Sequence, residues 1–166
     1  MLVGGMIGFL SYLCVIKISC KFVKKTNMGE VRAKIVVQNL RDIHLYEEGY
    51  LKQSDIRFLE LDALADTGAV ETLLPQDAAE ALGLKTTDRI IVTLANDEKI
   101  ELPLAGPVLI TVCGRKWRGD CLIGPLRCEP LFGQLIMESL DLVVNPRAQT
   151  ITVNPASPFL PSLKMK

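Results

Sequence analysis

Short apolar runs separated by turn residues fill most of this chain, and this pattern constrains its fold more than any other feature. Alternating or β-branched residues predict strands and strand pairs at residues 30–37, 57–65, 89–104, 107–124 and 142–155. The three pairs are expected to turn at Asn96-Asp97, at residues 114–116 and at Asn145-Pro146, because these residues tolerate turn geometry. A chain of this kind must fold mainly as a β-sheet.

Two short helices are expected beside these strands. Pro75 suits the first position of a helix that passes through three alanines and stops at Gly83. A second short helix is expected after Gly133, whereas residues 40–56 are polar and predict a loop with at most a helical turn. With 166 residues the chain has room for one domain with a proper core. We therefore expect a small, mainly β domain with a closed, barrel-like sheet and one or two short helices.

Composition excludes several classes of function. The charges balance at 19 Lys and Arg against 19 Asp and Glu, and no basic stripe is interleaved with aromatic residues. Nucleic acid is therefore not an expected partner. The single histidine, His44, removes most zinc and Ser-His-Asp chemistry from consideration, and a catalytic cysteine would depend on it as a base. The five cysteines form no Cys-x-x-Cys pair, which predicts reduced thiols in a reducing compartment such as the cytoplasm.

The N-terminal stretch differs in composition from the rest of the chain. Residues 1–16 are uncharged and mostly apolar, which is at or just below the roughly 17–25 residues that a membrane-spanning helix needs. Four positive charges follow at helical spacing, on Lys17, Lys21, Lys24 and Lys25. This stretch is therefore set apart from the domain that follows it.

Two interpretations of residues 1–27 stay open. As a membrane anchor, this segment would keep the rest of the protein in the cytoplasm through its positive flank. Alternatively, the start is mis-assigned and the chain begins at Met28, directly before the first expected strand. A membrane is an expected partner only under the first interpretation. The remaining chain divides into a domain at residues 28–155 and a C-terminal tail at residues 156–166.

One apolar run ends in an acid, a hydroxyl and a glycine, at Asp66, Thr67 and Gly68. Alone, this triplet predicts an ordinary tight turn, because Asp and Thr side chains bond nearby backbone N–H groups and glycine adopts unusual conformations. The apolar and small residues on both sides favour a carboxylate at a buried rim, where an unpartnered charge is costly. Such a carboxylate requires a proton, a hydrogen-bond donor or a second acid with which it shares a proton.

No second acid of the chain occupies a similar setting. Asp120 lies in a polar hairpin, and Asp141 follows an expected helix with no small-residue turn after it. The simplest source of a partner acid is Asp66 of a second copy, because a two-fold interface brings a residue near its axis face to face with itself. The pattern therefore favours a homodimer.

The chain resembles the retropepsin-like aspartic peptidases, and within them it is most similar to the small bacterial single-domain members of clan AA. Residues 63–69, ALADTGA, match the active-site Asp-Thr-Gly-Ala of that family after a strand of the right character. Residues 108–144 resemble the second half of a retroviral protease, with a hairpin, a Leu-Ile-Gly-Pro strand, and an apolar-apolar-Gly element opening a short helix. The resemblance covers residues 28–155 and implies a closed β-barrel that acts as a homodimeric aspartic endopeptidase.

The resemblance also implies roles for the residues of the loop. Asp66 of each copy would be a catalytic carboxylate, and the two carboxyls would share one proton and activate a water. Thr67 would form a hydrogen bond across the two-fold axis, and Gly68 would orient the carboxylate through its N–H. Ala69 would be small because the polypeptide substrate passes close to it. No metal or organic cofactor is implied.

The hairpin at residues 89–104 corresponds to the flap that closes over bound peptide in this family. The resemblance and the apolar character of the chain suggest subsite contacts from Leu94, Ala95, Asn96, Ile123 and Leu131. Unlike retroviral flaps, this hairpin has no glycine at its tip. That departure leaves a second function open, a peptide-binding or assembly module of the same fold with little or no turnover.

Overall fold

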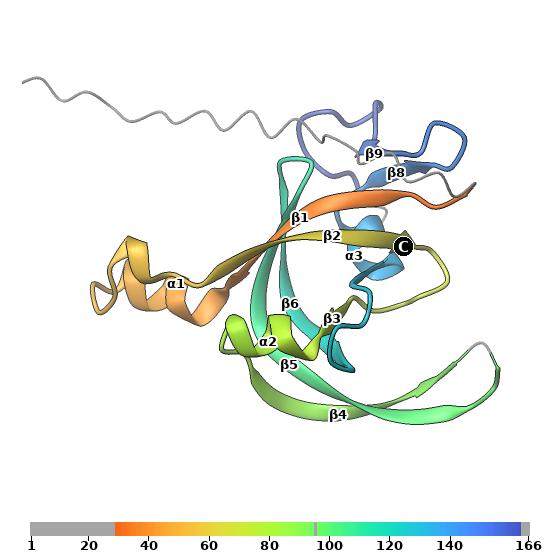
Figure 1. Cartoon of the computed structure of the whole chain (residues 1–166). Helices are drawn as coiled ribbons and strands as arrows, with labels where there is room; N and C mark the ends of the chain where they lie inside the picture. Colours follow the sequence, from red (N-terminus) through yellow and green to blue (C-terminus); the bar gives the residue numbers. More distant parts are fainter. Residues whose placement is uncertain (1–28, 95, 164–166) are drawn as a thin grey trace, which may run out of the picture.

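The computed structural model describes residues 29–94 and 96–163 (Figure 1). The segment at residues 1–27, the alternative start at Met28, and Ala95 of the predicted hairpin tip lie outside this range, so the expectations placed on them stay predictions. Within the described ranges, no helix has both the length and the apolar character needed to cross a membrane.

The described chain is mainly β, as the sequence predicted, and it has three short α-helices and one 3₁₀ turn where one or two short helices were expected. The elements in chain order are β1 (Arg32–Asn39), α1 (Leu40–Glu47), η1 (Gln53–Asp55), β2 (Phe58–Asp66), β3 (Leu73–Pro75), α2 (Gln76–Ala81), β4 (Lys85–Thr93), β5 (Lys99–Val112), β6 (Arg115–Gly124), β7 (Leu131–Gly133), α3 (Gln134–Ser139), β8 (Leu142–Asn145) and β9 (Thr150–Val153).

Six strands close into a barrel. Their order is β1-β2-β7-β3-β6-β5, and pairing between β1 and β5 completes the ring. β4 pairs with the first half of β5, and the two strands form a long hairpin that extends away from the barrel (Figure 1). The short strand β7 lies between β2 and β3, parallel to the first and antiparallel to the second. The expected barrel is thus confirmed. β7 places residues 131–133 beside the end of β2.

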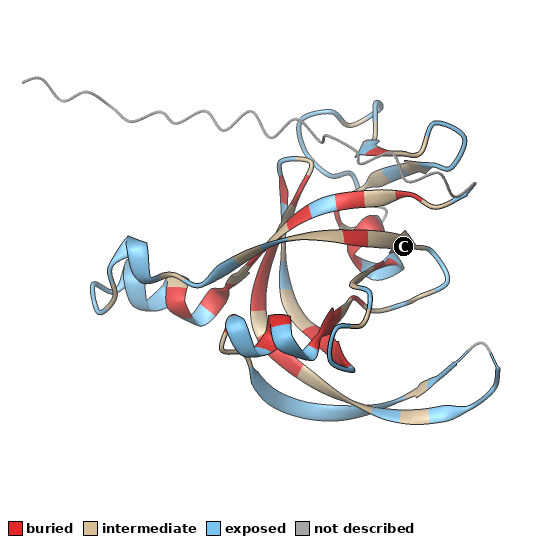
Figure 2. Cartoon of the chain, viewed as in Figure 1, coloured by how far each residue is buried: buried red, intermediate tan, exposed pale blue. Residues whose placement is uncertain are grey.

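The core fills the barrel and the space under α3. Side chains from alternate positions of the strands point inward, as their period of two requires. Figure 2 shows these buried positions as red bands on β1, β5 and β6, while β4 is almost wholly exposed. The largest fully buried side chains include Phe132, Ile35, Leu74, Ile110 and Ile136.

Residues 40–56 differ from expectation, because a two-turn helix, α1, takes the first eight residues of the predicted loop. The Asn39 side-chain oxygen caps this helix by accepting from the N–H groups of Arg41 and Asp42. The Asn39 amide also donates to the carbonyl of Leu82, at 2.9 Å. Asp42 is buried and forms two 2.7 Å bonds with the guanidinium of Arg57. These tertiary contacts stabilise a helix that its polar sequence does not predict.

The two hairpins predicted around residues 89–124 share one continuous strand. β5 runs for 14 residues through Pro103 and Pro107. A break in its register with β6 between Ala105 and Val108 absorbs the second proline, which has no N–H to donate. The strand therefore serves both the hairpin with β4 and the barrel.

A small second sheet of β8 and β9 is tied to the barrel by Arg115. The buried guanidinium of Arg115 donates to the carbonyls of Leu140, Asp141 and Ser157. Asp141 in turn accepts from the Ser157 hydroxyl and from the N–H of Ser162, so the first part of the tail is held against the domain.

Candidate functional site

The loop that follows β2 carries the predicted catalytic residues. Asp66 is the last residue of β2 and lies opposite Gly133 of β7. Its Oδ1 accepts a 2.8 Å hydrogen bond from the N–H of Gly68, and its carbonyl accepts from Ala69. Asp66 is half-buried, whereas Thr67 and Gly68 are exposed. The carboxylate is thus held by the turn of its own loop, and the loop tip is open to solvent.

Three hydrogen bonds fasten the rest of this loop to β7 and α3. The N–H of Gly133 donates to Thr72 Oγ1, at 3.1 Å. The next two N–H groups along the chain donate to the carbonyls of Ala69 and Val70, at 2.8 and 3.0 Å. The apolar-apolar-Gly element at residues 131–133 therefore lies directly behind the Asp66 loop. The position of the carboxylate therefore depends on a segment more than sixty residues away.

Gly133 is required by this close packing. A Cβ at this position would overlap the carbonyl oxygen of Glu71 and would lie 2.8 Å from that of Val70. Both are backbone atoms, which cannot move away by a change of rotamer as a side chain can. Glycine at this position is what allows the loop to approach the start of α3.

The face of the sheet that carries the Asp66 side chain is apolar. Residues opposite one another on paired strands share a face, and so do residues two apart along one strand. The pairings Leu64↔Leu131, Leu73↔Leu131, Leu73↔Leu122 and Leu104↔Leu122 therefore place five leucines on one face with Asp66. We call these residues the leucine strip: Leu64, Leu73, Leu104, Leu122 and Leu131.

The leucine strip points away from the barrel core. The neighbouring positions Ala63, Leu74, Ile123 and Phe132 belong to the core cluster, so the alternate positions face outward. Most of the strip is only half-buried. Leu122 is buried without belonging to the core cluster. The strip is an apolar surface next to the carboxylate, on the side that is not filled by the core.

The hairpin of β4 and β5 continues this apolar face. Ile90 is paired with Leu102 and Val92 with Ile100, and the β5 members of these pairs share the face of Leu104. The hairpin and the loop after β2 project toward the same side of the molecule in Figure 1. An extended chain lying beside the leucine strip would therefore meet apolar side chains on the hairpin as well.

Four of the predicted substrate-binding residues lie in two separate parts of the described structure. Ala69 belongs to the Asp66 loop, and Leu131 belongs to the leucine strip. Leu94 and Asn96 lie at the exposed end of the hairpin, where the Leu94 N–H donates to the carbonyl of Glu98. The contacts of these four residues with a substrate stay predictions.

Ile123 does not join them, and this part of the prediction is corrected. Ile123 is paired with Leu74 and packs in the core cluster, on the face opposite to Asp66. Its neighbour Leu122 lies on the Asp66 face instead. The sequence reads Leu-Ile-Gly at this point, and nothing local says which of two adjacent aliphatic residues faces inward.

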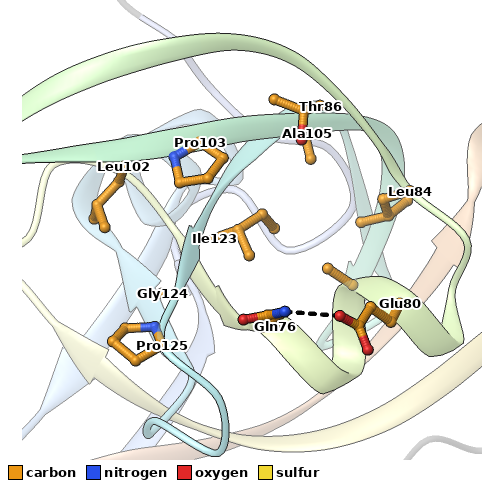
Figure 3. Close-up of a pocket in the computed structure, with 11 residues that line it drawn as sticks. Gln76, Glu80, Leu84, Thr86, Leu102, Pro103, Ala105, Ile123, Gly124 and Pro125 are labelled. Carbon is orange, nitrogen blue, oxygen red and sulfur yellow. Dashed lines mark hydrogen bonds between the residues drawn. The ribbon is translucent and has the colours of Figure 1, made fainter.

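One pocket of the described chain is separate from Asp66, which is not among its lining residues. It has a volume of about 470 Å³ and lies between α2, the base of the hairpin and the end of β6 (Figure 3). We call it the α2 pocket; its walls include Gln76, Glu80, Leu84, Leu102, Ile123 and Pro125. Ile123 thus contributes to a cavity, but to one that does not contain the carboxylate.

Two of the three described cysteines, Cys121 and Cys128, are unsuited to nucleophilic catalysis. Burial raises the pKa of Cys121 to about 12, and the nearby charges of Asp120 and Glu71 act in the same direction. Burial also raises the pKa of Cys128, assisted by Asp77. Since the thiolate is the reactive form, these side chains stay protonated and unreactive near neutral pH. Asp66 is the better candidate for chemistry in this chain.

No protein-family profile matches the sequence, and no curated protein is significantly similar to it.

Proposed function

We propose that this protein is a retropepsin-like aspartic endopeptidase that acts as a homodimer. In this proposal Asp66 of each copy contributes one carboxyl group to a shared active site, and the substrate is an extended polypeptide. The observation that carries the proposal is the placement of Asp66. The carboxylate ends a barrel strand, is oriented by the Gly68 N–H, and shares its face with the leucine strip.

The exposed surface around the loop supports a two-fold contact at this point. The side chain of Val70 is 64% exposed and that of Leu135 is 42% exposed, although their backbones are hydrogen-bonded to each other. Two adjacent exposed apolar side chains beside a half-buried acid suit an interface better than they suit solvent. An isologous contact there would bring the two Asp66 loops together.

The chemistry needs one proton on the pair of acids. Two carboxyls roughly 3 Å apart cannot both ionise, so one stays protonated. The ionised member would take a proton from a bound water as the water oxygen attacks the scissile carbonyl carbon, while the protonated member donates to the carbonyl oxygen. Collapse of the tetrahedral intermediate then breaks the C–N bond, and the leaving nitrogen takes a proton from the dyad.

The leucine strip and the hairpin would hold the substrate on either side. Leu131 and Leu122 would contact side chains next to the scissile bond, and Leu94 and Asn96 would approach from the hairpin. The apolar character of these walls favours cleavage between apolar residues, since each buried apolar side chain stabilises the complex by about 1.5–3 kcal/mol.

The full chain and the Asp66→Asn variant, incubated with a diverse peptide pool between pH 4 and 7.5, test the proposal. We expect products by mass spectrometry from the first protein and none from the second. Equal cleavage by both, or cleavage by neither across this range, would contradict it. Sedimentation gives an independent check, because a monomer at micromolar concentration would remove the shared active site.

A second function is favoured by one feature, the hairpin tip without glycine between Thr93 and Lys99. A stiff tip would suit a module that binds peptide and does not turn it over. Peptide binding that survives Asp66→Asn without any product would select this alternative.

A further inference from the structure

The α2 pocket does not include Asp66 in its walls, yet it has the features of a ligand site. Its volume of about 470 Å³ falls within the roughly 300–1,000 Å³ of small-molecule sites. Apolar side chains dominate its walls, with Leu84 and Leu102 toward the hairpin and Ile123 and Pro125 on the β6 side (Figure 3). The pocket thus offers an apolar cavity of useful size.

Its polar groups converge on one wall. Glu80 and Gln76 lie one turn apart on α2, and the Gln76 side-chain N–H₂ donates to Glu80 Oε1 at 2.8 Å (Figure 3). Within residues 29–94 and 96–163, no Lys or Arg pairs with Glu80. Gln76 and Glu80 are both exposed, so the pocket presents a single carboxylate at its solvent-facing rim, hydrogen-bonded to Gln76 and not neutralised by a cation of the described residues.

We propose that the α2 pocket binds an apolar organic cation, an aliphatic or aromatic amine whose apolar body enters the cavity and whose ammonium group pairs with Glu80. Charge complementarity selects this class, because an acid would be repelled by Glu80 and a neutral compound would gain no attraction from it. The binding does not involve Asp66.

Such a ligand would also brace the hairpin. The pocket is formed by α2 on one side and by the hairpin base, Thr86 and Leu102, on the other. A body that touches both walls favours the conformation in which they are close. The hairpin base would then open less often, which makes the site a point of control over the hairpin.

Three probes of one shape test the proposal on the full chain: 4-phenylbutylamine, 4-phenylbutanol and 4-phenylbutanoate. NMR titration should shift the methyl signals of Leu84, Leu102 and Ile123, with the amine binding about three- to tenfold more tightly than the alcohol and the acid binding least. Equal affinities for the three, or shifts elsewhere only, would overturn the proposal.

Two variants separate the charge from the cavity. Glu80→Gln should bring the amine to the affinity of the alcohol, whereas Glu138→Gln should leave it unchanged. Glu138 is the matched control because it accepts the same one-turn bond, from Gln134 on α3, and does not line the pocket. Thr86→Phe, at an exposed strand position, should fill the cavity and weaken all three probes. An amine affinity unaffected by both Glu80→Gln and Thr86→Phe would contradict the site.

Two further measurements test whether binding depends on Asp66 and whether the ligand braces the hairpin. Asp66→Asn should bind the amine as the unchanged chain does, so loss of peptidase activity and loss of this site can be told apart. Amide hydrogen exchange along β4 should slow when the amine is bound. Binding without any slowing would overturn the bracing of the hairpin.

Discussion

The Thr72 hydroxyl oxygen accepts a 3.1 Å hydrogen bond from the N–H of Gly133, joining the end of the Asp66 loop to the strand behind it. Thr72 is only 1% exposed, so no water replaces this bond if it is lost. The carbonyl of Thr72 also accepts from Leu122, one of the leucine strip. One residue therefore links the loop, β7 and β6.

We predict that Thr72→Val destabilises the protein by about 1–3 kcal/mol, because the buried N–H of Gly133 would lose its acceptor without gaining another. The shape of the side chain is nearly kept, so packing contributes little to the loss. Urea unfolding measures the change. Thr72→Ser retains the hydroxyl and should recover most of the stability; a Ser variant as unstable as the Val variant would contradict this explanation.

Gly133→Ala should lower the stability of the protein more than the addition of one methyl group usually does. The added Cβ overlaps the carbonyl of Glu71, so the Asp66 loop must move away from α3. Overpacking of this kind destabilises by about 1–3 kcal/mol, and we expect the upper end because the obstacle is backbone. Under the proposed function, displacement of the loop should abolish peptidase activity as well.

Gly114→Ala is the control for the Gly133 prediction. Gly114 has a φ of +77°, but a Cβ there meets open space. The substitution should cost about 1–2 kcal/mol through backbone conformation alone and leave activity intact. Equal loss of activity in both variants would show that the Gly133 effect is general instability and not displacement of the loop.

The Asp42–Arg57 pair should make stability depend on pH in the acid range. Hydrogen bonds from the Arg57 guanidinium hold the pKa of Asp42 below its ordinary value of 3.8. Between that lowered pKa and 3.8 the unfolded chain binds more protons than the folded one, so the free energy of unfolding falls as pH falls. The contribution is fully present above 3.8 and is lost as pH drops through the folded pKa.

Asp42→Asn measures this contribution directly. At pH 7 it should lower the free energy of unfolding by about 1–2 kcal/mol, a modest value because the Arg57 side chain is 46% exposed. The difference from the unchanged chain should shrink as the pH falls below 3.8 toward the lowered pKa of folded Asp42. The exposed Asp55→Asn should change stability by no more than about 0.5 kcal/mol. A difference for Asp42→Asn that stays constant with pH would refute the assignment.

Local chemistry was sufficient to predict the hairpins, the barrel-like class and the loop at Asp66. The hairpins turn at Asn96-Asp97 and Asn145-Pro146, because the side chains and φ preferences of these residues favour turns. These preferences act within a few residues of the chain. The helix that stops at Gly83 was also predictable, since Gly83 has the positive φ of +60° expected after a helix end. These features depend on neighbours in sequence.

The features that sequence patterns missed depend on partners far along the chain. α1 is stabilised by the bond from Asn39 to Leu82 and by the bonds between Asp42 and Arg57, which are distant in sequence. Its one local signal is the pattern of a helix cap, an Asn followed three residues later by an acid. The choice of Leu122 over Ile123 for the Asp66 face follows from the register of β3 with β6. A one-residue change of register exchanges the two faces, so no local pattern settles it.

Thr67 supplies the sharpest test of the proposed homodimer. Its side chain is exposed, and no residue of the described chain accepts from or donates to its hydroxyl. Near a two-fold axis each Thr67 hydroxyl would bond the loop of the other copy, so Thr67→Val removes two bonds at once. At about 1 kcal/mol each, the dimer should dissociate about thirtyfold more readily, whereas Thr67→Ser should keep the affinity within about threefold. Sedimentation across a concentration series measures both, and urea unfolding should show little change for either, since the monomer loses no bond. A Val variant that dimerises as tightly as the unchanged chain would place Thr67 away from the axis and remove the shared active site that the proposed peptidase requires.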